Sequence, residues 1–299
     1  MEKINTRLTL KILAVLAFFN VIAWMVVYEL STRRFLEVVF FDVGQGDAIF
    51  IQTPQKHQIL IDGGPDSTIL EKLGNEMPFW DRNIDLIILT HPEHDHISGL
   101  LEVLKRYKIE NILWTGIIRE TSEYQEWRHL IEDEKAQIKI AQAGQKISWR
   151  ISSNPGSEDE FRGYFDILYP LENLEGQEVE NTNNTSIALQ LIFGENSFLF
   201  TGDAYRSIER KLIKEKPSLD SDVLKVGHHG SKTSSAQDFI EQISPEIAVI
   251  SVGKNNPYGH PHQETLEILK DFGIRILRTD LDGDIKIISD GKYYQVESR

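Results

Sequence analysis

The feature that most constrains this chain is a cluster of three histidines and two carboxylates at residues 91–96, HPEHDH. It follows the almost wholly apolar run Ile84–Leu89, which predicts a buried strand. The cluster therefore lies where a strand ends and a helix begins, a position that carries binding loops in layered α/β folds. Imidazole and carboxylate together suit zinc, manganese or iron. The alternative is a polar helix start with Asp95 as its N-cap.

Three further polar groups follow predicted strands in the same way. Each places His or Asp at the carboxyl end of an apolar run: Asp203, the pair His228-His229, and His260 with His262. Taken singly, Asp203 could be a helix cap and the histidine pair a satisfied turn. Together with residues 91–96 they supply about as many ligands as a two-metal site needs.

Cysteine is absent from the 299 residues, which excludes disulfides, thiolate zinc sites, iron–sulfur clusters and a cysteine nucleophile. Any metal must therefore be held by His, Asp, Glu or Asn. The formal charge is 32 − 46 = −14, and residues 1–35 carry +3, so the rest of the chain carries −17. Such a chain is not coated in basic surface for nucleic acid.

The run at residues 12–30 contains two clearly polar residues, Asn20 and Glu29, and is long enough to cross a bilayer as a helix. A secretory signal would have a shorter apolar core and small residues before its cleavage site, whereas the distal end here, WMVVYEL, is bulky. Trp24 and Tyr28 suit a membrane interface. A buried core helix is the third interpretation.

Three positive charges precede this run and two follow it, which favours an inside N-terminus. We therefore predict a single-pass protein of the cell membrane. Residues 1–34 would form a cytoplasmic stub, the anchor helix and a juxtamembrane segment, and residues 35–299 a domain on the outer side. No protein partner is inferred.

From residue 35 the pattern alternates between short β-rich runs and amphipathic helices. Strands are predicted at 36–41, 48–52, 58–61, 84–89, 164–169, 186–193, 197–200, 223–226, 247–251, 274–278 and 285–288. Helices are predicted at 97–107, 123–135, 205–214, 235–242 and 263–272. Two successive units of strands followed by helices predict an α/β (α+β) fold, a four-layer αββα sandwich. The acidic stretch 171–184 is predicted to be an exposed loop.

At this point the chain resembles the metallo-β-lactamase fold superfamily and, within it, the hydrolase domain of the competence protein ComEC, over about residues 36–288. The resemblance is carried by FDVGQGDA at 41–48, LIDGG at 60–64, THPEHDHISG at 90–99, NTS at 184–186, FTGD at 200–203, LKVGHHGSK at 224–232, SVG at 251–253 and YGHP at 258–261. One predicted anchor helix stands in place of the multi-span channel of ComEC.

The superfamily signature is His-x-His-x-Asp-His. This chain keeps His91, Asp95 and His96, but Glu93 stands at the second histidine position and His94 at a position that the pattern leaves free. Asn184 stands where the histidine of the third motif is missing. Oxygen donors at these two positions make one metal site harder, which is compatible with manganese as well as zinc.

The resemblance implies two divalent metal ions, zinc or manganese, and a role for each motif residue. His91 and Glu93 would bind the first ion, Asp95 and His96 the second, and Asp203 would bridge them. Either His228 or His229 would complete the second site, and the other would face the substrate. The catalytic candidates are Asp95, His260 and Asn184; the candidate substrate contacts are Asn184, Ser231, Lys232 and His260. Asp42 and Asp62 would support the ligands from behind, with strand-end turn capping as the alternative.

Two metal ions and no nucleophile-elbow serine predict a metal-dependent hydrolase without a covalent intermediate. The first hypothesis is a phosphodiesterase or nuclease acting on single-stranded DNA outside the membrane, as the ComEC resemblance implies. Lys232, Lys254, Arg206, Arg210 and Lys211 could supply a local basic patch against the acidic background. The alternatives are a cell-surface hydrolase of envelope phosphodiesters or of lactone and β-lactam-like rings, and a binding protein whose metal site has decayed.

Overall fold

The protein is described by a computed structural model that covers residues 6–31, 35–150, 162–216 and 218–298. It divides into two compact units, Met1–Arg34 and Phe35–Arg299. The first five residues of the predicted stub, the side chain of Tyr28 and the juxtamembrane arginines Arg33 and Arg34 lie outside the described residues. Each unit is described by itself.

The first unit contains one helix, α1 (Thr6–Ser31), among its described residues. No glycine or proline interrupts it, and Arg7–Val27 is long and apolar enough to cross a membrane, with none of that stretch buried. The predicted N-terminal apolar helix is thus confirmed, and with it a candidate membrane span.

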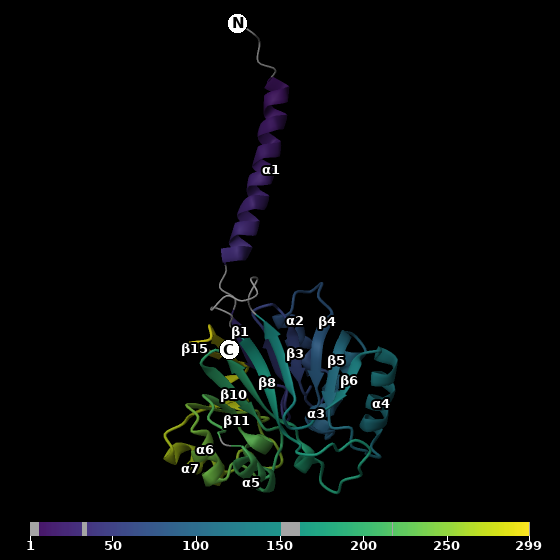
Figure 1. Ribbon diagram of the computed structural model, residues 1–299, viewed down its shortest axis with the longest axis vertical. Coiled ribbons are helices and arrows are strands. Elements are labelled where there is room, and N and C mark those ends of the chain that lie inside the picture. The colour runs from purple at the N-terminus through teal and green to yellow at the C-terminus, as the bar shows by residue number, and fades with distance from the viewer. Residues whose placement is uncertain (1–5, 32–34, 151–161, 217, 299) are drawn as a thin grey trace. The chain divides into compact units, whose positions relative to one another are not determined.

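The second unit, the body, is built on two sheets (Figure 1). In its described residues the first sheet has the order β15-β14-β1-β2-β3-β4-β5-β6. Its strands are β1 (Leu36–Phe40), β2 (Ile49–Gln52), β3 (Gln58–Ile61), β4 (Asn83–Ile88), β5 (Lys108–Trp114), β6 (Gln137–Ile140), β14 (Ile285–Ser289) and β15 (Tyr294–Ser298). Strands β3 to β6 are parallel, so their carboxyl ends share one edge of the sheet.

The second sheet has the order β13-β12-β11-β10-β9-β8-β7 in the same part of the chain. Its strands are β7 (Lys146–Arg150), β8 (Arg162–Tyr169), β9 (Ala188–Phe193), β10 (Asn196–Phe200), β11 (Val223–Lys225), β12 (Ile247–Ile250) and β13 (Arg275–Arg278). Strands β10 to β13 are parallel and also end together at one edge.

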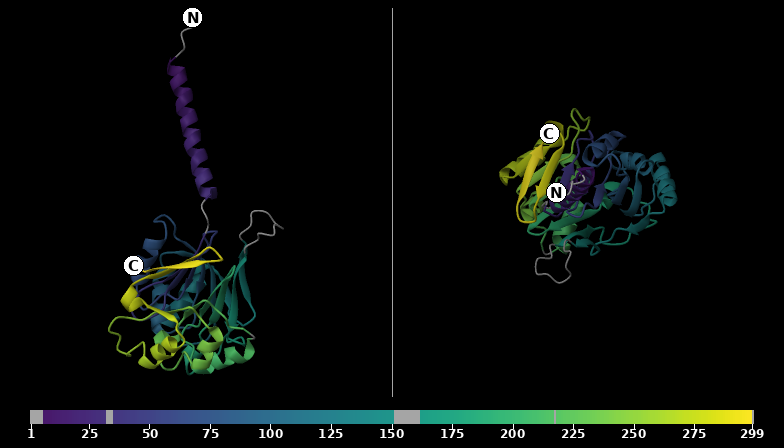
Figure 2. Two further views of the ribbon diagram at one scale, coloured as in Figure 1. Left: turned by 90° about the vertical axis from the view of Figure 1, so that its left-hand side faces the viewer. Right: turned by 90° about the horizontal axis from the view of Figure 1, so that it is seen from above.

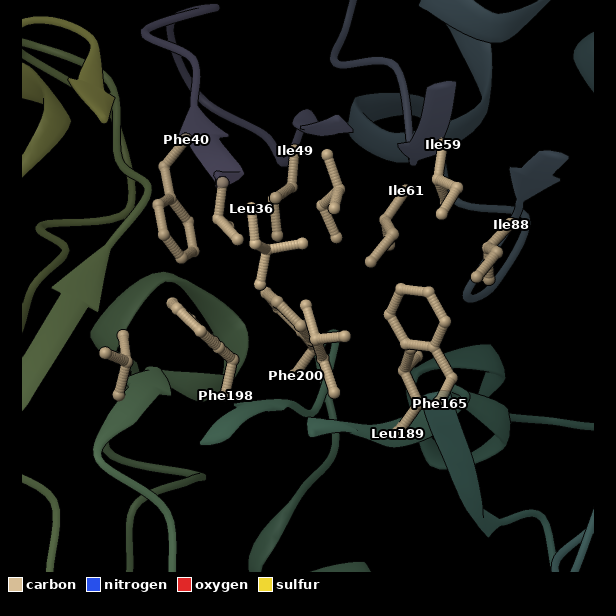
Figure 3. Close-up of a cluster of buried hydrophobic side chains, with 14 of the residues drawn as sticks. Leu36, Phe40, Ile49, Ile59, Ile61, Ile88, Phe165, Leu189, Phe198 and Phe200 are labelled. Carbon is tan, nitrogen blue, oxygen red and sulfur yellow. The ribbon is translucent and has the colours of Figure 1, made fainter. Parts of the chain in front are cut away.

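The two sheets pack face to face, and helices cover their outer faces. The inner layer is an apolar core in which Phe40, Ile49 and Ile61 of the first sheet meet Phe165, Phe198 and Phe200 of the second (Figure 3). A second apolar cluster lies under α2 (Thr68–Glu76), α3 (His94–Leu104) and α4 (Ser122–Glu134), and a third under α5 (Arg206–Glu215), α6 (Gln237–Ile243) and α7 (Gln263–Asp271). The predicted four-layer αββα sandwich is confirmed.

The chain returns to its first sheet at the end. Strand β14 pairs with β1 in an antiparallel register that sets Leu36 opposite Ser289, and β15 adds to it (yellow in Figure 2). The sequence had placed the closing strand 285–288 in the second unit of strands and helices. Pairing partners far apart in the chain are not encoded in local periodicity, so the sheet to which a strand belongs is decided by packing.

Several elements were absent from the sequence prediction. Helix α2 and strands β5, β6, β7 and β15 were not predicted, nor were the short helix α8 (Thr279–Asp282) and the 3₁₀ turns η1 (Thr182–Thr185) and η2 (Gly227–Gly230). In β5 only the last three residues are buried in succession, so its pattern is mixed. Helix α3 begins at His94 rather than at the predicted residue 97, so part of the histidine cluster forms its first turn.

Candidate metal centre

Four loops bring the predicted polar groups to one end of the body. His91 follows β4, Asp203 follows β10, His228 and His229 lie in η2 after β11, and His260 follows β12. Because β4 and β10 belong to different sheets, the loops converge from both halves of the sandwich. Helix α3 adds Asp95 and His96 from its first turn.

Asp203 lies at the centre of this arrangement, with four imidazoles around its carboxylate. The Nε2 atoms of His96 and His229 are each 3.4 Å from a carboxylate oxygen, and those of His228 and His91 are at 3.8 and 3.9 Å. The Asp203 side chain is 4% exposed. Asp95 joins the group through a 3.2 Å contact between its Oδ2 and Nε2 of His229.

In each of these imidazoles the second ring nitrogen, Nδ1, makes a further polar contact that orients the ring. Nδ1 of His96 is 2.8 Å from Oδ2 of Asp62, and Nδ1 of His229 is 2.9 Å from the carbonyl oxygen of Ser251. Nδ1 of His91 is 3.0 Å from Oγ1 of Thr90. Since Thr90 Oγ1 donates its own proton to Asp62, we assign the Nδ1 proton to His91.

His228 is held in the same way, with Nδ1 2.9 Å from Oγ1 of Thr233. With a proton on Nδ1, each ring directs Nε2 at the centre and offers its lone pair there whenever the ring is neutral. Orientation of a ligand imidazole through its second nitrogen is the usual arrangement around protein-bound metals.

The donor set fits a divalent cation. Nε2 of His91, His96 and His229 and Oδ1 of Asp203 are buried and have no hydrogen-bond partner in the described structure. Buried polar atoms are rarely left unpaired, so four that face one another fit a site for a cation. Among the described residues, three groups of donors lie close enough to hold an ion: His91, His96 and Asp203; Asp95, His96 and His229; and Asp47, Asp62 and His96.

The turn after β11 directs the side chains of His228 and His229 toward the carboxylate of Asp203. His228 and His229 both have left-handed backbone angles, with φ of 47° and 53°. L-residues with side chains seldom adopt this conformation, and it persists where the surrounding structure over-determines it, often at functional sites. The turn sends the buried His229 toward Asp95 and the 19% exposed side chain of His228 toward the rim.

Asp62 supports the centre at the end of β3. Its carboxylate accepts hydrogen bonds from Thr90 N at 2.8 Å and from Thr90 Oγ1 at 2.6 Å, besides the contact with His96. Helix α3 reaches this position because two glycines meet: a Cβ on Gly99 would lie 1.8 Å from the carbonyl oxygen of Gly63. Asp62 therefore lies behind His96, and its role in supporting a metal ligand stays a prediction.

Sequence reasoning missed a buried ion pair behind the imidazoles. The Lys225 ammonium contacts Asp47 and lies 3.3 Å from the carbonyl oxygen of Gly202, and both side chains are at most 2% exposed. Asp47 in turn lies 3.4 Å from Nδ1 of His229. The sequence did contain a signal for this ion pair. Lys225 lies inside the apolar strand VLKV, and a lysine is rarely buried unless it is paired.

The electrostatics of the cluster favour cations. Burial lowers the pKa of His91 to about 3, so its ring is neutral at pH 7. Burial acts in the same direction on His96 and His229, but the nearby carboxylates, Asp203 first, raise the pKa of both rings well above 6.5. The negative potential that attracts protons to these rings also attracts divalent metal ions.

The supporting carboxylates differ in their pKa. Burial raises the pKa of Asp62. For Asp47, burial acts in the same direction, but Lys225 and His229 overcome it and hold the pKa at about 2. Asp47 is therefore ionised at neutral pH and compensates the buried lysine.

Glu93 does not join the donors in the described structure. Its Oε1 accepts a hydrogen bond from Thr182 and lies 3.2 Å from Nη2 of Arg119. Residue 93 is the N-cap position of α3, from which the carboxylate points toward the loop after β5. Its ligand role stays a prediction. His94, which the signature leaves free, is 65% exposed and faces Glu123.

The asparagine nearest the centre is Asn183 rather than the predicted Asn184. Asn183 Nδ2 is 3.4 Å from Nε2 of His228, whereas Asn184 Oδ1 accepts a hydrogen bond from Ser207 on α5. The two asparagines are adjacent in the 3₁₀ turn η1, and only the phase of that turn decides which one faces inward. Residue types alone cannot give this phase.

The remaining predicted residues are scattered around the rim. His260 stacks near His228 and His229, and its buried Nδ1 has no hydrogen-bond partner among the described residues. Burial, with His229 and His228 nearby, lowers its pKa to about 4. Lys232 is exposed, whereas Ser231 is buried and its Oγ accepts hydrogen bonds from Thr233.

Asp42 lies apart from the imidazoles. Its Oδ1 accepts a hydrogen bond from the backbone N–H of Gly44, and its own N–H donates to Asp284. This is the turn-capping alternative of the sequence analysis. Asp42 therefore caps a turn at the end of its strand.

Comparison with known families agrees with this geometry. The model described as "Metallo-beta-lactamase superfamily" matches residues 41–254. "ComE operon protein 3" of Bacillus subtilis (strain 168) is 33% identical over 84% of this chain and 32% of its own length. "Competence protein ComA" of Neisseria gonorrhoeae is 31% identical over 83% of this chain and 32% of its own length. The chain thus spans about a third of the curated relatives it matches.

Two solved structures share the fold at 14% identity. One, described as Igni18, a metallo hydrolase from Ignicoccus hospitalis KIN4/I, superposes with a TM-score of 0.51 over 84% of this chain and 98% of its own. The other, a CmlA beta-hydroxylase mutant, has a TM-score of 0.50 over 86% of this chain and 54% of its own. The fold therefore leaves the reaction open, and the side chains must decide it.

Proposed function

The chain belongs to the metallo-β-lactamase superfamily, and from that premise we propose that it is a dinuclear-metal phosphodiesterase that cleaves single-stranded DNA on the outer side of the cell membrane. The superfamily implies divalent metal binding, and relatives named as competence proteins support a DNA substrate. The N-terminal apolar helix and those relatives suggest membrane association.

The observation that carries the proposal is the ring of four Nε2 atoms around Asp203, each backed through Nδ1. A decayed site would not be expected to keep unpaired buried donors aimed at one another, because their burial costs free energy without a cation. His91 would hold one ion, Asp95, His96 and His229 the other, and Asp203 would lie between them. Two such ions, zinc or manganese, would supply an activated water and neutralise charge on a phosphoryl group.

Aromatic and basic side chains at the mouth support a nucleic-acid substrate. Tyr205 stacks on His228 with ring centroids 5.2 Å apart, and Tyr258, which is 64% exposed, stacks on His260 at 5.7 Å. Stacking of bases on exposed rings is the usual basis of single-strand binding. Lys232 is exposed and its backbone N–H donates to His262, whose ring centroid is 5.0 Å from that of His260, so it could provide a cation for a phosphate.

The loop that carries Tyr258 is held by one side chain. Asn256 Oδ1 accepts from the N–H groups of Tyr258 and His260, and Nδ2 donates to the carbonyl oxygens of Gly253 and His260. The ring is therefore presented on an ordered loop. His260, neutral at pH 7, would exchange a hydrogen bond with a phosphate oxygen or a leaving group.

The test uses the full chain in lipid nanodiscs, loaded in turn with zinc, manganese and magnesium. The substrates are labelled single-stranded and duplex DNA, bis-p-nitrophenyl phosphate, a lactone and a β-lactam. We expect cleavage of the single strand that chelator abolishes and that falls steeply as salt rises. Lys232→Ala should lower the salt slope by about one, whereas Lys214→Ala, 82% exposed on α5, should leave it unchanged.

An intact oligonucleotide beside rapid turnover of the small diester would contradict a DNA substrate and favour an envelope phosphodiester. Turnover of the lactone or β-lactam alone would favour ring hydrolysis. Metal binding without turnover of any substrate would favour a binding protein.

A further inference from the structure

Two large aromatic side chains lie exposed side by side at the end of the body opposite the candidate metal centre. Phe79 is 80% and Trp80 is 72% exposed, and their rings meet edge to face with centroids 4.8 Å apart. They occupy the turn between α2 and β4. A contiguous pair of exposed aromatic rings on a soluble surface marks an interaction site.

The turn that presents these rings is ordered. Asp81 N–H donates to the carbonyl oxygen of Pro78 at 2.9 Å, and the Asp81 carboxylate accepts from Asn83 N and from Gln58 Nε2. Met77, just before the pair, is buried under α2 and α3. The backbone is thus anchored on both sides, so the exposure of Phe79 and Trp80 is a property of the fold.

Strand register places further aromatic residues at the same edge. Because β1, β3 and β4 run in the same direction, β1 and β4 begin at one edge of the sheet. Phe35, 38% exposed, immediately precedes β1. Since Leu36 pairs with Ser289, the β14–β15 turn with Tyr293, 68% exposed, also lies there. We call Phe35, Phe79, Trp80 and Tyr293 the aromatic face.

Chain connectivity indicates what covers this face. Phe35 follows the last residue of the apolar helix, Ser31, by four positions, which span at most about 14 Å. If that helix crosses a membrane, the edge of the body that begins with Phe35 stays close to the lipid surface. Tryptophan, tyrosine and phenylalanine favour that interface, where an apolar ring meets polar headgroups.

The charges around the face have both signs. Lys56, Arg82 and Lys292 lie on its turns, and so do Asp81 and Asp290. A mixed set gives little net attraction to anionic lipid, so the rings would supply most of the affinity. We therefore expect the aromatic face to bind a lipid headgroup layer mainly through its rings, whatever the charge of the lipid.

We propose that the aromatic face rests in the headgroup layer of the membrane and turns the metal centre toward the aqueous phase. The centre lies at the carboxyl ends of β4 and β10, whereas the face lies at the opposite end of β4, about 20 Å of strand away. Figure 1 shows α2 and β4 at one end of the body and α5 and α6 at the other. A polymeric substrate would then reach the centre from the side away from the lipid.

The chain has no natural cysteine, so single labels can be introduced cleanly. Phe79→Cys and Leu281→Cys would each carry a nitroxide in the full chain, reconstituted in phosphatidylcholine vesicles. Leu281 is the matched control, because it is 70% exposed on α8, which follows β13 at the metal end. Flotation first tests anchoring, and power saturation with oxygen and with a water-soluble nickel chelate then reports depth.

We expect the ratio of oxygen to nickel accessibility at position 79 to exceed that at position 281 several-fold. Trp80→Glu in the labelled Phe79→Cys chain should lower the ratio toward the control, since a carboxylate is costly at that depth. Equal ratios at the two positions would overturn the proposal. Dipolar broadening at position 79 that disappears on dilution with unlabelled chain would also overturn it, because a second copy would then cover the face.

Failure to float would overturn the proposal through its premise, the membrane helix. None of these measurements uses hydrolysis. The proposed orientation can therefore be wrong while the proposed phosphodiesterase activity is right. The activity can likewise be wrong while the orientation is right.

Discussion

The two sides of the metal centre are built differently. The inner side consists of Asp95, His96 and His229, whose donors contact one another and are backed by Asp62, Ser251 and the buried Lys225–Asp47 pair. The outer side consists of His91, Glu93, Asn183 and His228. There only the two imidazoles aim at Asp203, while Glu93 is held by Arg119 and Thr182.

If two ions bind as proposed, this difference predicts that their affinities are unequal. Preorganised donors bind without rearrangement, whereas Glu93 must leave an ion pair and a hydrogen bond before it can reach a metal. We therefore expect a tight inner ion and an exchangeable outer ion. The following experiments test that distinction, and they are ordered from the largest expected effect to the smallest.

The largest effect is expected from removing the shared carboxylate. Asp203→Asn should lower kcat by on the order of a thousandfold or more and reduce bound metal on both sides, because all four imidazoles converge on it. Metal content by mass spectrometry and kcat on a diester are the measurements. Asp220→Asn, at an exposed position three residues before β11, is the control. Unchanged metal content would remove Asp203 from the centre.

The next effect concerns the ion pair behind the inner side. Lys225→Met should destabilise the metal-free protein by about 3–5 kcal/mol, because it leaves Asp47 as an uncompensated buried charge. Asp47→Leu added to Lys225→Met should recover part of that loss. Denaturant unfolding measures both. Lys105→Met, which removes ion pairs with Glu102 and Glu126 from a lysine side chain that is 38% exposed, should cost about 1 kcal/mol or less. Equal losses would contradict the special place of Lys225.

The two ions should also differ in pH dependence. His96 and His229 have raised pKa values without metal, so inner binding must release their protons. Its affinity should rise with pH between 6 and 8, by up to about a hundredfold per pH unit if two protons leave. His91 has a pKa of about 3 and is already neutral, so its ion should bind with little change over that range. Stepwise calorimetric titration at several pH values measures both affinities, and parallel slopes would contradict the distinction.

The smallest effect is expected at Glu93. Glu93→Gln should weaken the outer ion by about tenfold if the carboxylate shifts onto metal, and leave the inner ion unchanged. Arg119→Ala should strengthen the outer ion, since it frees Glu93 from its ion pair. If both variants leave the outer affinity unchanged, Glu93 is an N-terminal residue of α3 and no ligand.

Local pattern carried much of the fold, and particular elements show why. Strands such as β3 and β12 are short apolar runs ended by turn residues, and α7 has a clear amphipathic repeat, so their positions were predicted closely. Strand β5 alternates charged and apolar residues and was missed. The sheet assignment of β14 depends on pairing across nearly 250 residues, which no local window contains.

The candidate site divides in the same way. The chain's residue types alone required that any metal be held without thiolates, and four strand ends carrying His or Asp indicated where the ligands would meet. Only the tertiary structure buried His229 beside Asp95 while leaving His228 partly exposed, and brought Asn183 rather than Asn184 to His228. It also paired Glu93 with Arg119 and Lys225 with Asp47. The reason is directional: a sequence fixes which donor follows which strand, but the aim of a side chain depends on backbone angles and neighbours that exist only once both sheets have packed together.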